Sequence, residues 1–189
     1  MQFTFSKGGN AGFAISNNRQ NLASDFSPLG ILIEKGKYDY SRRMIFFKTD
    51  DSRKIAAAVQ YDWGNYYNGK LNTIDAGLIY SPLPYITATL SVNSNQLKQV
   101  GKNLADKNVN LYTITGRFAL NPRVQPTALY QKNSFNKQNL YNFRLSWEYK
   151  PLSYVYIVFN NRSFISTTRQ SEEASIFKIS YLKQFQEIR

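Results

Sequence analysis

Residues Leu140–Tyr149 read LYNFRLSWEY, and this stretch decides the fold class because its side chains alternate between apolar and polar. The residues between the apolar ones are Asn, Arg, Ser and Glu, and the apolar set is Tyr141, Phe143, Leu145, Trp147 and Tyr149. Successive side chains of a β-strand point to opposite faces, so a period of two places this set on one face. We therefore expect a strand with one apolar and one polar face.

The same alternation recurs along the chain, whereas helical periodicity is hard to find. The other alternating stretches are Ile55–Trp63, Ile74–Tyr80, Ile86–Val92, Tyr112–Leu120 and Phe177–Tyr181. Each strand is expected to be about ten residues long, roughly twice the common length in soluble proteins. We expect about nine strands from Tyr38 onward, and weaker strands within Gln2–Lys7 and Ala11–Ser16.

The joints between these stretches fall into two kinds that alternate along the chain. The tight joints are rich in residues that favour turns, and they are Asp50–Arg53, Ser81–Pro84, Asn121–Arg123 and Lys150–Ser153. The other joints are polar and mostly longer, and they are Gly64–Lys70, Asn95–Asn108, Asn133–Asn139 and Ser163–Glu173. Long alternating strands with short turns at one end and longer loops at the other are typical of a transmembrane β-barrel. The sequence therefore predicts an all-β, antiparallel, up-and-down barrel of long hairpins.

In such a barrel the two faces of each strand have different roles, because lipid covers the outside and water fills the inside. Charged residues on the polar faces are expected to line the lumen, as selectivity rings or as space-filling salt-bridge ladders: Arg117, Arg144, Glu148 and Lys178. The expected lipid-facing residues are Ile114, Phe118, Phe143, Leu145, Trp147 and Ile179. Tyrosines beside two tight turns are expected to form an interface girdle: Tyr80, Tyr85, Tyr149 and Tyr154.

The amino-acid composition excludes several kinds of catalytic and metal-binding site. The 189 residues include no His and no Cys, which removes thiol chemistry, His bases and nearly every transition-metal site. We expect no catalytic residue, no metal ligand and no cofactor. Asp62 and Asp75, on neighbouring expected strands, come nearest to an acid/base pair, but solvated lumen side chains are the simpler interpretation.

The net charge of +12 calls for an anionic partner. In the expected outer loop Asn95–Asn108, Lys98, Lys102 and Lys107 are placed to pair with lipopolysaccharide phosphates. The basic residues are dispersed through the chain, so nucleic acid is not an expected partner.

Several segments resemble, in order and spacing, the C-terminal barrel region of a Gram-negative outer-membrane family of unknown function. They are Gly36–Tyr38, Gly64 with the Asn68–Gly69 tip, Ser81–Pro82, the strand containing Gln131, and Asn142–Tyr149 with the Pro151 turn. The resemblance runs from about Gly30 to Phe185. Full-length members of that family carry a signal peptide and an N-terminal module similar to family-nine carbohydrate-binding modules.

The resemblance implies that residues 1–189 are one β-barrel region, the C-terminal part of a larger barrel. Within it we expect weaker strands and a lead-in loop over 1–37, the clearest strands over 38–185, and a tail at 186–189. The implied location is the Gram-negative outer membrane, reached as part of an exported precursor. The alternating strands and the two kinds of joint favour a structural or channel-type role. The expected partners are outer-membrane lipid, lipopolysaccharide and other barrel or surface-complex subunits.

Two alternatives remain open. A soluble all-β ligand-binding domain, either a lipocalin-like barrel or a sandwich, would bury the apolar faces in its own interior. More distantly, the chain would be part of a glycan-acting surface enzyme, an idea that rests on the sugar-binding-like module of the family.

Overall fold

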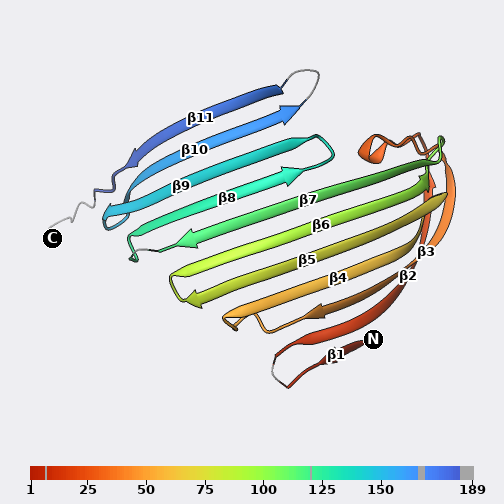
Figure 1. Ribbon diagram of the computed structural model, residues 1–189, viewed down its shortest axis with the longest axis horizontal. Helices are drawn as coiled ribbons and strands as arrows, with labels where there is room; N and C mark the ends of the chain where they lie inside the picture. The colour runs from red at the N-terminus through yellow and green to blue at the C-terminus, as the bar shows by residue number, and fades with distance from the viewer. Residues whose placement is uncertain (7, 120, 166–168, 184–189) are drawn as a thin grey trace, which may run out of the picture.

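The computed structural model describes residues 1–6, 8–119, 121–165 and 169–183, and these hold one antiparallel sheet of eleven strands in sequence order (Figure 1). The strands are β1 (Gln2–Thr4), β2 (Asn10–Leu22), β3 (Gly36–Lys48), β4 (Ile55–Tyr66), β5 (Gly69–Leu83), β6 (Ile86–Val100), β7 (Ala105–Phe118), β8 (Val124–Asn133), β9 (Gln138–Lys150), β10 (Ser153–Ile165) and β11 (Arg169–Ser180). The one helical element among these residues is the short 3₁₀ turn η1 (Pro28–Gly30). No helix in the described part of the chain is long and apolar enough to cross a membrane.

The all-β antiparallel meander is confirmed, including the nine strands from Tyr38 onward, which are β3 to β11. The sheet is not closed: β1 and β11 are its two edges. The prediction that β2 is weak and short was wrong, because β2 pairs with β3 from Asn10 to Leu22 without a break. Its second half is polar on both faces, so the alternation of apolar residues could not reveal it. Residues 184–189, which include the end of the expected last strand and the tail, lie outside the described residues.

The predicted long loops were also wrong. The strands continue through most of these segments, so the tips that join them are short. Lys98 therefore lies in β6 and Lys107 in β7, and only Lys102 lies in the tip between these strands. Side-chain hydrogen bonds such as Thr73 Oγ1 to Asn95 Oδ1 (2.8 Å) and Ser94 Oγ to Asn110 Oδ1 (2.7 Å) link the extended strands. Polar pairs thus continue the sheet beyond the point where apolar alternation ends.

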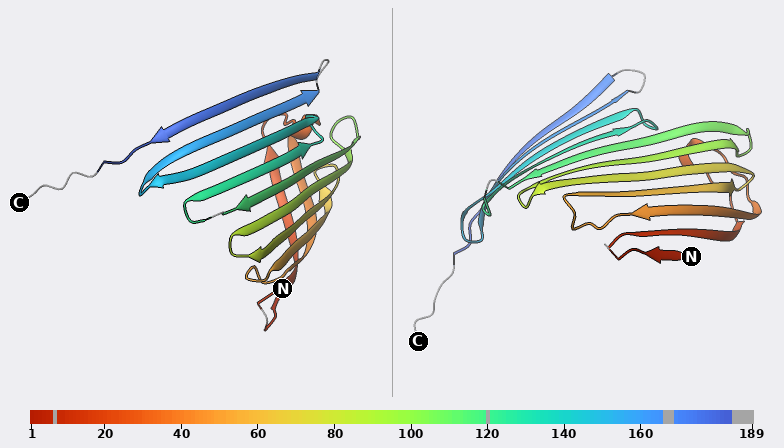
Figure 2. Two further views of the ribbon diagram at one scale, coloured as in Figure 1. Left: turned by 60° about the vertical axis from the view of Figure 1, so that its left-hand side comes forward. Right: turned by 60° about the horizontal axis from the view of Figure 1, so that its bottom comes forward.

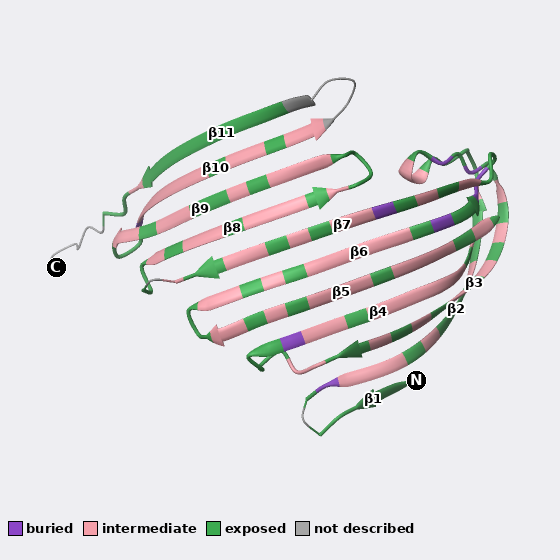
Figure 3. Cartoon of the chain, in the orientation of Figure 1, coloured by how far each residue is buried: buried purple, intermediate pink, exposed green. Residues whose placement is uncertain are grey.

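The sheet is strongly curved, and its N-terminal strands bend round toward the middle strands (Figure 2). The face that carries Gln60, Asp75 and Asn93 is hollowed between β2 and β7, where a cavity of about 520 Å³ lies. Few side chains in the described chain are fully buried, and most strands alternate between half-buried and exposed positions (Figure 3). A single curved layer, and no second sheet or helix layer, makes up the described fold.

Residues 23–35, which join β2 to β3, form the longest connection in the described chain and fold across the neighbouring tips. Ile31 and Ile33 of this loop pack with Leu97 and Val100 of β6 in a small buried cluster. The loop is also tied by polar contacts: the Lys102 N–H donates to the Leu32 carbonyl (2.8 Å).

Two further side chains hold the same region together. Lys107 Nζ donates to the Leu29 carbonyl (2.6 Å) and lies 4.5 Å from the centre of the Phe135 ring. The Asn68 side-chain amide pairs with the backbone of Gly101, donating to its carbonyl and accepting from its N–H (both 2.9 Å). Loop 23–35 is therefore a fixed part of the fold.

Gly101 is the point of closest approach, so Gly101→Ala should release loop 23–35. Its φ is +78°, and an added Cβ would lie 2.5 Å from both Ile31 Cγ2 and the Leu32 carbonyl oxygen. We expect a loss of more than about 1 kcal/mol in stability, and faster proteolysis within 23–35. Gly116→Ala is the matched control, because nothing lies within 4 Å of a Cβ there. Equal protease resistance of the two variants would contradict this account of the loop.

Candidate functional site

The most distinctive surface is an apolar belt on the face opposite the hollow. Because each strand pair keeps one register along the belt, side chains from all the strands β2 to β11 fall on this one face. We define the belt as Phe13, Ile15, Ile45, Phe47, Val59, Tyr61, Ile74, Leu78, Leu90, Val92, Tyr112, Ile114, Phe118, Tyr130, Tyr141, Phe143, Leu145, Trp147, Val155, Ile157, Phe159, Phe177 and Ile179. All six predicted lipid-facing residues are in it.

The belt is exposed to solvent. Ile114 is 48% exposed, Phe143 42% and Trp147 48%, although a soluble fold would cover such side chains. A contiguous apolar surface of this extent marks a place where something else binds. No other layer of the described chain packs on it.

The belt ends abruptly toward the tip that joins β6 to β7. On β7 the outward residues change from Tyr112 to Asn110 and Asn108, and on β5 they change from Ile74 to Asn72. At the opposite end the belt reaches the tight turns. The strands are therefore longer than the belt, and the excess lies at the end where loop 23–35 folds over.

Aromatic residues border the belt at both ends. Toward the long-loop end Tyr61 stacks on Trp63, with ring centres 5.0 Å apart, and Tyr130 lies 4.8 Å from Tyr141. Toward the tight turns Phe118 contacts the Tyr85 ring at 6.2 Å. Tyr112 and Phe118 of β7 are six residues apart, and so are Tyr141 and Trp147 of β9, which corresponds to about 20 Å along a strand.

Of the four predicted girdle tyrosines, Tyr80, Tyr85 and Tyr149 lie at the tight-turn end of the belt; Tyr149 contacts the Trp147 ring at 6.2 Å. Tyr154 is placed differently. It stacks on Tyr156 at 5.6 Å, on the opposite face, because it lies opposite Glu148 and alternates along β10 with the belt residues Val155 and Ile157. A second aromatic border consists of Tyr61, Trp63, Tyr112, Tyr130 and Tyr141, and none of these is among the four predicted girdle residues, which were chosen beside tight turns.

The four predicted lumen residues share the hollowed, polar face. Arg117 and Arg144 are both opposite Thr127 of β8, on its two sides, and Lys178 lies opposite Tyr156. The Arg144 guanidinium lies 5.5 Å from the centre of the Tyr156 ring. Glu148 Oε1 accepts the Leu152 N–H at 2.9 Å, so it caps the tight turn between β9 and β10. A salt-bridge ladder between Arg144 and Glu148 is not among the ion pairs of the described residues.

Asp62 and Asp75 lie on the same polar face but each has its own partner. Asp62 forms an ion pair with Arg42, whose side chain is only 12% exposed, and Arg42 also donates to the Leu71 carbonyl (3.2 Å). Asp75 accepts from the Asn93 side-chain amide. These contacts account for both carboxylates structurally. Within the described residues no group of three or more carboxylates could hold a metal ion.

Tyrosines gather where loop 23–35 meets the sheet. Tyr67 lies 4.7 Å from Tyr66, 5.1 Å from Tyr38 and 5.5 Å from Tyr40, measured between ring centres. Burial, followed by the neighbouring Tyr40 and Tyr38, raises the pKa of Tyr67. Tyr67 is therefore neutral at ordinary pH, and the cluster supports the loop through ring packing.

Lys102 and Glu34 form an ion pair (2.9 Å) between the β6–β7 tip and loop 23–35. The hydrogen bond to Glu34, and then its charge, raise the pKa of Lys102. Since a raised lysine pKa stabilises the fold below the ordinary value of 10.5 and loses that effect only above it, this contact is intact throughout the neutral range.

Comparisons of the chain with models of protein families, with curated proteins and with solved structures found no match. The resemblance to an outer-membrane family therefore stays a prediction, and the function has to be inferred from the belt and the polar face.

The Arg42–Asp62 pair should matter to stability. Asp62→Asn removes the charge that compensates a mostly buried guanidinium, which should cost about 1–3 kcal/mol. Asp39→Asn is the control, because its partner Arg19 is 86% exposed, and such surface pairs contribute little. Urea unfolding of the two variants measures the difference. A loss for Asp39→Asn that equals the loss for Asp62→Asn would contradict the structural role of the buried pair.

Proposed function

We propose that this chain is an outer-membrane β-barrel protein of a Gram-negative bacterium, or a fragment of one, with a structural or channel-type role. The observation that carries the proposal is the exposed apolar belt, bordered by aromatic residues at both ends and by polar side chains beyond them. Such a band, with aromatic girdles at the two interfaces, is what the lipid-facing surface of an outer-membrane barrel requires.

Energetics favour lipid as the occupant of the belt. Full burial of a side chain such as Leu or Phe is worth about 1.5–3 kcal/mol, and the belt residues remain roughly half exposed. Covering the whole belt would therefore gain on the order of 1 kcal/mol per side chain. The inner belt strands, β3 to β10, also have neighbours on both sides that pair with their backbone groups, as hydrocarbon demands.

The direction of curvature argues against a soluble ligand-binding barrel. In a lipocalin-like barrel the apolar side chains would line the concave interior. Here the hollowed face carries Gln60, Asp75 and Asn93, and loop 23–35 packs on that side. The apolar belt lies on the other face, where a closed barrel would present it outward.

The contact with lipopolysaccharide is proposed for a revised set of lysines. Lys102 pairs with Glu34, and Lys107 bonds to Leu29. Lys98 is exposed just beyond the belt and lies directly opposite Lys70 of β5 on the same face. Like charges directly opposite each other destabilise a sheet, and a lipid phosphate between them would relieve that repulsion.

An arginine scan of β7 tests the membrane proposal. Ile114→Arg lies within the belt and should cost about 2–4 kcal/mol if it faces hydrocarbon, so folding into vesicles should fail or slow sharply. Asn110→Arg is the matched control, on the same strand and face but beyond the belt, and should insert like the parent chain. Heat-modifiable gel migration after folding into vesicles reports the outcome.

Equal insertion of the two arginine variants would contradict the proposal. So would recovery of the parent chain as a soluble monomer without detergent, since an uncovered belt could not remain in water.

A further inference from the structure

The sheet has two edges whose backbone groups are unpaired within the described chain, and they lie at opposite sides of the molecule (Figure 1). β1 covers only the start of the β2 edge, from Asn10 to Gly12, and Met1 and Phe13 exchange backbone hydrogen bonds of 2.8 and 2.9 Å. Residues 14–22 of β2 have no such neighbour. Along β11 every side chain from Ser171 to Ile179 is exposed (Figure 3).

We propose that the free edge of β2 pairs with the free edge of β11 when the chain is in the membrane, closing β2 to β11 into a ten-stranded antiparallel barrel. This inference rests on the proposed function, because hydrocarbon does not tolerate an open sheet edge. Each free edge then has the other free edge of the same chain as its partner.

Strand direction permits this pairing. Neighbouring strands alternate in direction across the sheet, so β2 and β11 run antiparallel to each other, whereas β1 and β11 run parallel. Closing at β2 therefore gives an even-numbered, fully antiparallel barrel. The three residues of β1 would remain beside the tight-turn end of β2.

The hydrogen-bonding groups of the two edges also match. In β2 the odd-numbered residues bond outward, as the Phe13 N–H does to Met1. In β9 the even-numbered residues bond toward β8, as the Glu148 N–H does to Arg123. Since residues of an antiparallel strand alternate between their two neighbours, it follows from the registers that odd-numbered residues of β11 bond outward too. Odd residues of both strands also lie on the belt face.

One register matches the side chains along the seam. It places Ile15 opposite Phe177, Asn17 opposite Ser175, and Arg19 opposite Glu173, so apolar belt residues meet apolar ones and opposite charges meet. A slip of two residues in one direction sets Phe177 against Asn17. A slip in the other direction sets Ser175 against Ile15 and leaves Arg19 without an acidic residue opposite it.

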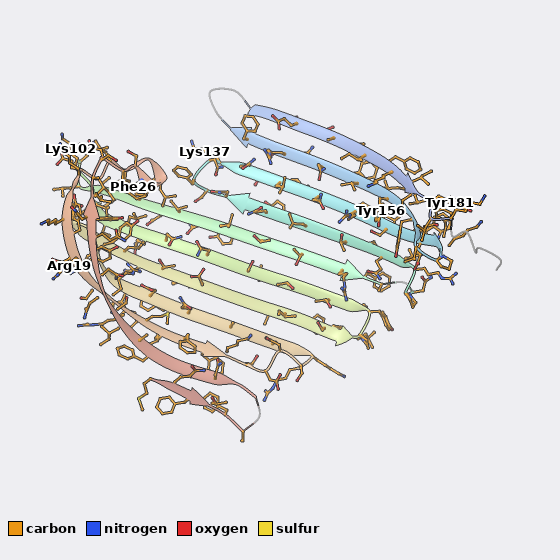
Figure 4. The ribbon with its side chains drawn as sticks, turned by 180° about the vertical axis from the view of Figure 1, so that it is seen from behind. Arg19, Phe26, Lys102, Lys137, Tyr156 and Tyr181 are labelled. Carbon is orange, nitrogen blue, oxygen red and sulfur yellow. The ribbon has the colours of Figure 1, made fainter. Side chains whose placement is uncertain are left out.

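The Arg19 guanidinium has further N–H donors for the proposed contact with Glu173. Its Nε bonds Asp39 at 2.7 Å, and a guanidinium has five N–H donors in all. Figure 4 shows Arg19 at the β2 side of the sheet, pointing away from it. Glu173 accepts from the Asn161 side chain at 2.7 Å. Closure would join the two polar pairs into one row just beyond the belt.

The total stagger of the strands around the proposed ten-stranded barrel gives a strand tilt that transmembrane barrels have. A continuous row of directly opposed residues starts at Gly12 near the tight-turn end of β2 and ends at Gln170 near the other end of β11. In the proposed seam Gln170 lies opposite Leu22, an offset of ten residues from Gly12. With standard strand spacings this offset corresponds to a strand tilt of about 35°, within the range of transmembrane barrels.

Disulfide trapping tests the seam, because the chain contains no native cysteine. The pair Asn18→Cys with Ala174→Cys is directly opposed in the proposed register, at a non-hydrogen-bonded position where the Cα atoms would be about 4.5 Å apart. Asn18→Cys with Glu172→Cys and Asn18→Cys with Ile176→Cys represent the two slipped registers. Ser16→Cys with Ile176→Cys is a second opposed pair, for use if the first variant does not fold.

Each variant is folded into phosphatidylcholine vesicles, oxidised mildly, and examined by gel migration and intact mass. We expect a disulfide within one chain to form at least about tenfold faster in an opposed pair than in the slipped pairs. Fastest reaction in a slipped pair, disulfides between two chains, or no disulfide in inserted protein would overturn the seam. Those results leave the membrane proposal standing, whereas failure of the parent chain to insert would overturn the proposed function itself.

Discussion

The constraint on which the structure depends is that each strand keeps its two faces separate across every strand pair. A shift of one residue at any pairing would turn the belt residues of the following strands to the hollowed face. One-residue shifts occur at the ends of three pairings, at Ser153/Tyr154, Tyr80/Leu83 and Leu97/Val100, and they leave every belt residue on the belt face. One wide apolar surface and one polar, hollowed surface therefore arise from local alternation that is repeated and kept in register.

The same constraint explains why so little of the chain is buried. A soluble domain packs its apolar layer against a second layer, whereas here the apolar belt faces outward and the polar face carries amide, hydroxyl and charged side chains. Stability within the sheet comes from the backbone ladders, from cross-strand pairs such as Tyr130 with Tyr141, and from the small cluster under loop 23–35. The sheet edges and the belt are the two surfaces that still require partners.

Much of this fold could be predicted from the sequence, because period-two alternation is a local signal. The stretch Leu140–Tyr149 predicts β9 (Gln138–Lys150) to within two residues at each end, and the tight turn at Pro151 follows from its turn chemistry. The second half of β2 and the outer ends of β5 to β7 could not be predicted in this way. Their side chains do not alternate regularly between apolar and polar, and only their pairing with neighbouring strands reveals them as strands.

The candidate site likewise has features that the sequence predicts and features that it does not. The sides of the sheet on which Arg117, Arg144, Glu148 and Lys178 lie, and on which the six lipid-facing candidates lie, follow from parity alone. Parity along β10 likewise places Tyr154 on the polar face, beside Tyr156. The partners of Lys102 and Lys107, by contrast, belong to a loop far away in sequence. Such long-range contacts leave no periodic pattern. The covering of Ile31 and Ile33 by β6 is of the same kind.

Spin labels placed one at a time along β7 from Asp106 to Phe118, in vesicles, measure whether hydrocarbon covers the apolar belt. If it does, accessibility to oxygen alternates with period two from Tyr112 to Phe118, with maxima at the belt residues, while a water-soluble nickel chelate reaches Asp106 and Asn108. High nickel accessibility at Ile114, or no alternation along the strand, would contradict it.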